Sequence, residues 1–218
     1  CGLNYAMAQN PQIINISWGF SFILEEKTEL MDVTLSKIFD RMMNEARSRN
    51  ILVVAGIGND SMQLTNSIKC YPASRVYAHE NGLSVGALSY ESAPPDLAMF
   101  SNYSSTADNY MTLAVPGENI RCAQPMYVQA AAAPALSPSG FQRKSGTSFA
   151  APLVSRLAAM IISIHNYPEP HQVKNKLLSF TTKHYKSGSP DFGFQAVFPD
   201  SLKTNLCRSI KKPDIPGI

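Results

Sequence analysis

Residues 144–152 read Lys-Ser-Gly-Thr-Ser-Phe-Ala-Ala-Pro, and this stretch decides how the rest of the chain is interpreted. A glycine and two hydroxyl residues lead directly into small and apolar residues, which predicts a helix beginning at or next to Ser148. The first N–H groups of a helix have no partner inside it, and the helix dipole is positive there. This position suits a nucleophilic serine and the negative charge that its attack creates. The same residues are also typical of an ordinary Ser/Thr N-cap, so the motif alone leaves both interpretations open.

The composition predicts a single globular domain. The chain has 218 residues, of which 44% are hydrophobic and 16% charged, enough for a real core. The net charge of +3 comes from Lys and Arg spread along the chain, which gives no case for nucleic acid or an anionic membrane surface. No apolar run reaches the roughly 18 residues that a membrane span needs. The chain starts at Cys1 without a leader, so we expect a mature, processed or trimmed piece.

The four cysteines lie far apart and include no C-x-x-C pair, which speaks against a metal site and implies no disulfide framework. They are Cys1, Cys70, Cys122 and Cys207. Their pairing and the redox compartment stay open.

Hydrophobic patterning predicts helices and buried strands in alternation. A short strand over 13–17, a helix over 29–49 and a continuous apolar strand over 51–55 form a βαβ unit with a loop at 56–60. A continuous apolar strand is typical of a parallel sheet covered on both faces. The other expected elements are the end of a helix at 3–8, strands at 83–88 and 112–115, a nearly all-apolar helix over 148–164 and a surface helix over 169–181.

Other segments show no clear period. We expect irregular structure over 61–82, with Tyr71-Pro72 a candidate cis peptide, and an exposed loop over 123–143. The polar segment after Gly19 is expected to be a connection, and the residues from 186 onward show no pattern. Neither an internal repeat nor a second domain is predicted.

Several motifs together resemble the subtilisin-like serine proteases (subtilases) over about residues 1–185. The motifs are Ile-Asn-Ile-Ser-Trp-Gly at 14–19, Val-Val-Ala-Gly-Ile-Gly-Asn-Asp at 53–60, Tyr-Pro-Ala-Ser at 71–74, Ser-Val-Gly-Ala at 84–87, Phe-Ser-Asn-Tyr at 100–103, Val-Pro-Gly-Glu-Asn-Ile at 115–120 and the serine motif at 145–152. The resemblance implies an α/β fold with three layers, a mainly parallel sheet and helices on both faces, missing its first strands. Residues 1–185 would be the portion of the catalytic domain that carries the nucleophile, and 186–218 a C-terminal tail of the same domain.

The resemblance also implies roles for single residues. Ser148 matches the nucleophile, and Asn59 matches the oxyanion-hole asparagine, whose amide donates to the developing oxyanion beside the Ser148 N–H. An amide suits this role because it donates without ionising. Without the resemblance, Asn59 is equally typical of a turn after a glycine.

Two short segments match the walls of the family's substrate site. These walls bind the extended substrate backbone and the side chain of the residue before the scissile bond. One wall is Ser17, Trp18 and Gly19, and the other is Gly56, Ile57 and Gly58. Because these walls consist mainly of small residues, we expect an apolar or broad preference for the substrate residue before the scissile bond. We expect Trp18 to narrow a subsite. The expected partner is a protein or peptide substrate.

A serine protease of this kind needs a histidine base and an aspartate that orients it. The family motifs for both residues precede the segment where this chain begins, and neither occurs here. The four histidines, expected to be surface or capping residues with His79 and His184 in loops, are His79, His165, His171 and His184.

Three explanations stay open for the missing residues. An upstream segment, on another chain or removed by processing, completes the sheet and the triad; or the chain is a pseudoprotease; or another base is used. In the first case, residues 1–218 are not expected to fold alone, because the sheet would lack its middle.

The chemistry requires no cofactor. Many subtilases bind structural calcium, but no Asp-rich loop supports a calcium site here. The resemblance is compatible with secretion or export, although these residues include no signal peptide.

Overall fold

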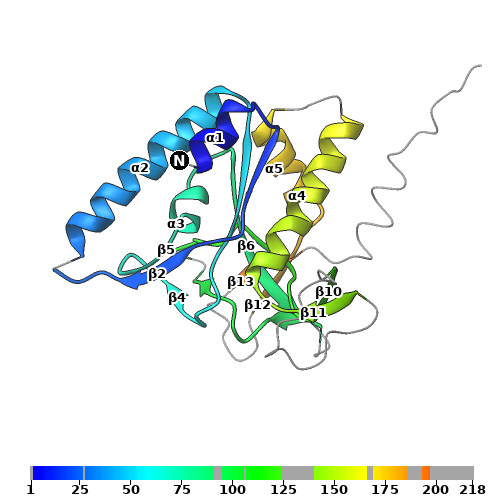
Figure 1. Ribbon diagram of the computed structural model, residues 1–218. Coiled ribbons are helices and arrows are strands. Elements are labelled where there is room, and N and C mark those ends of the chain that lie inside the picture. Colours follow the sequence, from blue (N-terminus) through cyan, green and yellow to red (C-terminus); the bar gives the residue numbers. More distant parts are fainter. Residues whose placement is uncertain are drawn as a thin grey trace, which may run out of the picture.

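A seven-stranded, mostly parallel sheet forms the centre of the computed structural model (Figure 1). The structure describes residues 2–26, 28–90, 95–105, 107–123, 140–165, 169–185 and 193–196. The strand order is β1-β3-β6-β9-β13-β12, with β7 paired to β6. These strands are β1 (Ile13–Ile16), β3 (Leu52–Gly56), β6 (Gly82–Ser89), β7 (Asp96–Leu97), β9 (Leu113–Pro116), β12 (Thr182–Tyr185) and β13 (Gly193–Ala196).

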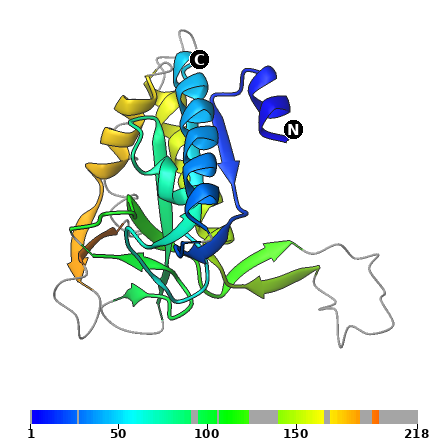
Figure 2. The same cartoon turned by 90° about the vertical axis from the view of Figure 1, so that its left-hand side faces the viewer.

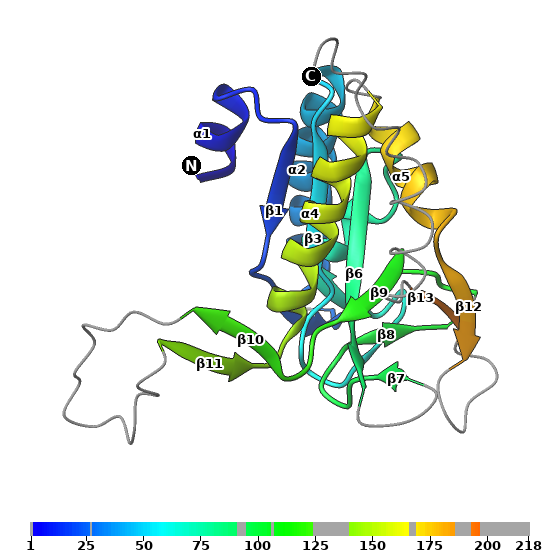
Figure 3. The same cartoon turned by 90° about the vertical axis from the view of Figure 1, so that its right-hand side faces the viewer.

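Helices cover both faces of this sheet, which gives three layers (Figure 3). One face packs against α2 (Glu29–Ser48) and α3 (Ala73–Val76), and the helix α1 (Gly2–Ala8) lies on the same side. The other face packs against α4 (Thr147–Ile164) and α5 (Pro170–Leu178). The predicted α/β class is confirmed.

Strand β3 explains why the central strands are apolar at every position. Successive side chains of a strand point to opposite faces. Val53 and Ala55 accordingly pack in the core on the α2 side, whereas Leu52 and Val54 pack on the α4 side. Because both faces are buried, alternation with polar residues is absent, as expected for a covered parallel sheet.

The long elements lie within a residue or two of their predicted positions, except that α5 ends at Leu178, three residues before the predicted end. The Tyr71-Pro72 bond is cis. The prediction missed short strands. The polar connection after Gly19 contains β2 (Phe20–Ile23), which pairs antiparallel with β5 (Ile68–Tyr71) in the segment expected to be irregular. Within that segment, β4 (Gln63–Leu64) pairs with β8 (Tyr103–Ser104). These strands are stabilised by pairing with segments distant in the chain, and their own residues show no hydrophobic period that would predict them.

The segment expected to be an exposed loop is partly a hairpin. Strands β10 (Ile120–Ala123) and β11 (Phe141–Lys144) pair antiparallel and project away from the body of the molecule (Figure 2). All four residues of β11 are exposed, so no buried face marks it in the sequence. Residues 124–139 of this predicted loop lie outside the described residues. From the patternless tail, residues 193–196 form β13 within the main sheet.

Helix α4 is long and apolar enough to cross a membrane by length and composition, which the sequence analysis did not expect. It contacts β1, β3, β6 and β9 instead, as the core helix of an α/β domain does. Strand β1 ends the sheet order, and no described strand pairs with its outer edge.

Candidate active site

Ser148 is the second residue of α4, close to the predicted position. Gly146 precedes the helix with a φ of +151°, a conformation that L side chains rarely adopt. Its N–H donates to the Gly117 carbonyl over 2.8 Å, which fixes the entry to the helix. Ser148 is half-buried and lines a cavity at the tip of a helix that is otherwise part of the core.

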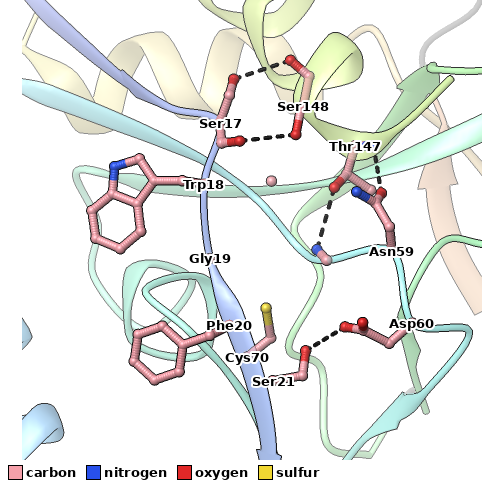
Figure 4. Close-up of a pocket in the computed structure, with 12 residues that line it drawn as sticks. Ser17, Trp18, Gly19, Phe20, Ser21, Asn59, Asp60, Cys70, Thr147 and Ser148 are labelled. Carbon is pink, nitrogen blue, oxygen red and sulfur yellow. Dashed lines mark hydrogen bonds between the residues drawn. The ribbon is translucent and has the colours of Figure 1, made fainter. Parts of the chain in front are cut away.

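Two reciprocal hydrogen bonds join Ser148 to the end of β1 (Figure 4). The Ser148 hydroxyl donates to the Ser17 carbonyl over 2.8 Å, and the Ser17 hydroxyl donates to the Ser148 carbonyl over 3.0 Å. The amide of Asn15 donates to the Ser17 hydroxyl oxygen over 2.8 Å. The carboxyl end of β1 and the N-terminus of α4 are therefore held together at Ser148.

Asn59 follows β3 and contacts the same helix tip. Its Oδ1 accepts a hydrogen bond from the Thr147 N–H over 2.8 Å, and the Thr147 hydroxyl accepts one from the Gly58 N–H over 3.3 Å. Oδ1 is occupied, and no hydrogen bond joins the amide nitrogen to another described residue; this nitrogen is turned toward the pocket (Figure 4). The loop after β3 and the start of α4 are thus placed so that Asn59 and Ser148 line one cavity.

This cavity has a volume of about 260 Å³ and contains most of the predicted site. Its lining residues are Ser17, Trp18, Gly19, Phe20, Ser21, Gly56, Gly58, Asn59, Asp60, Cys70, Thr147 and Ser148. Ile57 is not among them: its side chain is fully buried and packs in the core on the α2 side of the sheet, so this part of the predicted wall is wrong.

Sequence reasoning missed five of the lining residues: Phe20, Ser21, Asp60, Cys70 and Thr147. Asp60 and Thr147 belong to the motifs at 53–60 and 145–152, so the sequence could have predicted that they line the cavity. Phe20, Ser21 and Cys70 come from β2 and β5, and only the pairing of those strands brings them to the cavity. Burial raises the pKa of the Cys70 thiol, and a side-chain hydrogen bond between Cys70 and Ser21 offsets only part of this rise.

A buried asparagine holds the loop that carries Asn59. Asn102 is fully buried, and its Oδ1 accepts from the N–H groups of Asp60 (3.0 Å) and Met62 (2.9 Å). Its amide nitrogen donates to the Ile57 carbonyl over 3.1 Å. Both ends of the carboxamide are therefore used to fix the turn from residue 57 to residue 62.

None of the described histidines lines the cavity around Ser148. His165 caps the end of α4, and His171 lies in the first turn of α5 with its ring 3.2 Å from Glu169. His184 lies in β12 and not in a loop as predicted. His79 lies in a loop after α3, where its ring is 3.0 Å from Asp40, a pairing that the sequence did not suggest.

Comparison with known proteins assigns the chain to a family. The model of the subtilase family matches residues 2–195. The chain belongs to the subtilase family. The resemblance found in the sequence motifs is thereby confirmed, and the family is one of subtilisin-like serine proteases.

Two curated relatives illustrate the similarity. Subtilisin-like protease 2 of Trichophyton verrucosum is 30% identical over 153 residues, which cover 70% of this chain and 31% of the relative. Subtilisin-like protease 2 of Arthroderma otae is 29% identical over 160 residues, covering 73% of this chain and 32% of the relative. The chain therefore spans only 31–32% of the length of these two curated relatives.

Solved protease structures share the fold. The patellamide maturation protease PatA is 25% identical with a TM-score of 0.65, covering 95% of this chain and 67% of the other. A lanthipeptide protease, 21% identical, superposes with a TM-score of 0.68 over 93% of this chain and 64% of the other, which supports the fold alone.

The described residues contain no group of three or more His, Cys, Asp or Glu side chains that could hold a metal ion. Of the four cysteines, Cys70 and Cys122 are free, and Cys1 and Cys207 lie outside the described residues.

Proposed function

We propose that this subtilase chain carries the nucleophile and oxyanion site of a serine endopeptidase that hydrolyses peptide bonds. The observation that carries the proposal is the shared cavity of Ser148 and Asn59, in which Asn59 Oδ1 is engaged by the Thr147 N–H and its amide nitrogen is left as a donor. A hydroxyl at a helix N-terminus beside a neutral amide donor is the arrangement that acyl transfer requires.

The reaction proceeds through an acyl-enzyme. Ser148 Oγ attacks the scissile carbonyl carbon while a base takes the hydroxyl proton, and the carbonyl oxygen becomes an oxyanion bound by Asn59 and the Ser148 N–H. The tetrahedral intermediate then breaks its C–N bond, and the leaving amine receives the proton from the base. Water attacks the ester by the same steps in reverse order and restores the Ser148 hydroxyl.

The base and its aspartate come, in this proposal, from a polypeptide segment outside the 218 residues. Three observations support this. The Ser148 hydroxyl donates to a backbone carbonyl, and no described histidine lines its cavity. The outer edge of β1, next to Ser17, has no described partner strand. The curated relatives are about three times as long as the matched region.

The substrate is a peptide or protein chain in extended form. Residues 17–19, together with Gly56 and Gly58, line the cavity, and the glycines present no side chain to a substrate backbone. At Gly19, an added Cβ would lie 2.8 Å from the Tyr71 carbonyl oxygen, so this wall has no space for a larger residue.

A second candidate is a peptide-binding module without catalysis. The specific observation in its favour is the Ser148 hydroxyl itself, which is hydrogen-bonded to Ser17 with no described histidine within the cavity. In that case the cavity would still bind peptide, while no base would remove the Ser148 proton to make it a nucleophile.

Labelling with a fluorophosphonate separates the two candidates. The complete protein is treated with the probe and the modified residue located by mass spectrometry, with Ser148→Ala as the test variant. Ser155→Ala is the matched control, because Ser155 lies on the same helix with its hydroxyl bonded to Asn15 and the Ala151 carbonyl. Labelling at Ser148, lost only in Ser148→Ala, supports the protease; absence of labelling supports the binding module.

The source of the base is tested by labelling the 218-residue chain by itself. We expect slow or no labelling of this chain, and labelling at least about a hundredfold faster in the complete protein, since a general base contributes roughly 10²–10⁴ in rate. Circular dichroism of the isolated chain shows whether it is folded during the test. A folded isolated chain that is labelled as fast as the complete protein would contradict an external base.

A further inference from the structure

The hairpin of β10 and β11 carries an excess of positive charge. Residues 119–146, which include both strands and the residues that join them, contain three cationic residues and no Asp or Glu; the cations are Arg121, Arg143 and Lys144. The whole chain has 19 Lys and Arg against 16 Asp and Glu, so the two counts are equal once these three are set aside. Although Lys and Arg are spread along the chain, their excess over acidic residues therefore has the size of the charge on this segment.

The two arginines lie on one exposed face of the hairpin. Arg121 pairs directly with Arg143 across the strands, and Ala123 pairs with Phe141. Directly paired residues point to the same side, as do alternate residues of one strand, so these four side chains form one face, here called the arginine face. All four residues are exposed, and Phe141 retains 43% of its accessible surface. Like charges placed directly opposite destabilise a strand pair, and an anion bound between them would remove that cost.

Both guanidinium groups are oriented by contacts within the hairpin. The guanidinium carbon of Arg121 lies over the Phe141 ring, 4.4 Å from its centroid, and Arg143 Nη1 donates to the Asn119 carbonyl over 2.8 Å. A contact with a ring face uses none of the five N–H donors of an arginine, and the bond to Asn119 uses one. Among the described residues, neither arginine forms an ion pair with an acidic side chain. The arginine face thus presents two oriented cations with unused donors.

The hairpin is fixed next to the nucleophile. β11 leads into the start of α4 (Figure 3), and the Gly146 N–H joins this connection to the Gly117 carbonyl. Arg143 is five residues before Ser148, so their Cα atoms are at most roughly 18 Å apart. No described residue of the two strands lines the cavity of Ser148. A peptide bound in the cavity therefore reaches the arginine face only with residues several positions away from the scissile bond.

Resting on the proposed function, we propose that the arginine face binds an acidic segment of the protein substrate, within about ten residues of the scissile bond. Asp and Glu side chains suit this face because the planar fork of an arginine binds a carboxylate through two parallel hydrogen bonds. The exposed ring of Phe141 adds apolar contact beside the charges. Nucleic acid fits less well, because the charges of the rest of the chain balance and provide no excess of cations for a phosphate backbone.

Binding of short peptides tests the arginine face separately from catalysis. The complete protein with Ser148→Ala is titrated with two labelled peptides of equal length, one with a glutamate-rich and one with a glutamine-rich tract, and binding is followed by fluorescence anisotropy. We expect the glutamate peptide to bind about five- to twentyfold more tightly, since an exposed ion pair contributes up to about fivefold and two arginines are present. Adding Arg121→Gln and Arg143→Gln should abolish this difference, and a higher salt concentration should reduce it.

Arg41→Gln together with Arg156→Gln is the matched control, because it removes the same charge from exposed positions on α2 and α4. This control should keep the difference between the two peptides. An equal loss in the control would assign the difference to net charge and overturn the role of the arginine face. Tighter binding of a single-stranded DNA oligonucleotide than of the glutamate peptide, lost with Arg121→Gln and Arg143→Gln, would assign the face to nucleic acid and also overturn it.

Cleavage connects the arginine face with the proposed function. Two substrates share the residues around the scissile bond and carry either tract up to about ten residues away. We expect kcat/KM to be about five- to twentyfold higher for the glutamate substrate through a lower KM, and the Arg121→Gln and Arg143→Gln variant to lose this advantage without a change in kcat. Equal cleavage of both substrates would overturn the inference and leave the protease function intact. If the protein neither cleaves nor reacts with a fluorophosphonate, the proposed function fails, and the peptide titration alone decides: equal binding of both peptides overturns the arginine face as a site for acidic segments.

Discussion

The hydroxyls of Ser17 and Ser148 each donate to the backbone carbonyl of the other residue, over 3.0 and 2.8 Å. These residues are 131 positions apart in the chain, and the paired bonds join the end of an edge strand to the start of the central helix. The consequence is that any base acting on Ser148 must compete with the Ser17 carbonyl for its proton. With its hydroxyl donating to the Ser17 carbonyl, Ser148 is in a resting arrangement.

The first prediction concerns the amide of Asn59. Asn59→Asp keeps an oxygen acceptor for the Thr147 N–H but replaces the N–H donor by a charge that repels an oxyanion. We expect kcat to fall by about 10²–10³ with little change in KM, the loss known for the oxyanion-hole asparagine of subtilisin, a protein of the same family. Steady-state kinetics on a peptide substrate measure this. Asn44→Asp, exposed on α2, is the control, and a change mainly in KM would argue against an oxyanion role.

The second prediction concerns the buried carboxamide of Asn102. Asn102→Ala leaves the Ile57 carbonyl and the N–H groups of Asp60 and Met62 without their partner. We expect a loss of about 2–4 kcal/mol in the free energy of unfolding and a fall of roughly 5–10 °C in Tm. Thermal and urea unfolding of the complete protein measure it. Asn175→Ala, at an exposed position, should change the free energy of unfolding by less than about 0.5 kcal/mol. Equal effects of the two variants would refute the role of Asn102 in fixing the turn from residue 57 to residue 62.

The third prediction concerns Gly58, which has a φ of +106°. A Cβ at this position would lie 2.3 Å from Asn102 Nδ2 and 3.0 Å from Cys70 Sγ. Gly58→Ala is therefore expected to destabilise the fold by more than about 1 kcal/mol and to lower kcat by displacing Asn59. Gly2→Ala, where nothing lies within 4 Å of the added atom, is the control. Unchanged activity in Gly58→Ala would show that the loop tolerates a side chain there.

The fourth prediction concerns acid stability and Asp40. Arg75 binds Asp40 through two nitrogens at 2.9 and 2.7 Å, and His79 lies 3.0 Å from it. Burial raises the pKa of Asp40, but the hydrogen bonds from His79 and Arg75 and the Arg75 charge outweigh it, so the pKa lies below the ordinary 3.8. A lowered pKa in the folded state stabilises the protein above about pH 4, and this stability is lost as the pH falls through the folded pKa.

Asp40→Asn should therefore lose part of the stability at pH 6 and show a shallower fall in stability between pH 5 and pH 3. Urea unfolding at a series of pH values measures both effects. Asp108→Asn serves as the control carboxylate, since Asp108 is bonded to Ser105 and not to a basic side chain in the described residues. A parallel pH dependence of Asp40→Asn and the unaltered protein would contradict the assignment.

The family and the long elements could be read from local patterns. The apolar run at 51–55 and the helical spacing of residues 29–49 each predict one element, because a covered strand and an amphipathic helix have distinct periods. Strands such as β2 and β11 could not be read in this way. Their residues have no buried face with a regular period, and their pairing partners lie 18 to 51 positions away.

The sequence by itself determined the subtilase family, the α/β class and the candidate pair Ser148 and Asn59, because these depend on contiguous motifs. Tertiary structure alone decided that Ser148 is hydrogen-bonded to Ser17, that Ile57 faces the core, and that Asp60, Ser21 and Cys70 close the far end of the cavity. The physical reason is that these contacts join strand ends and loops distant in the chain. Only the packing of α4 on the sheet and the pairing of β2 with β5 bring them within hydrogen-bond range.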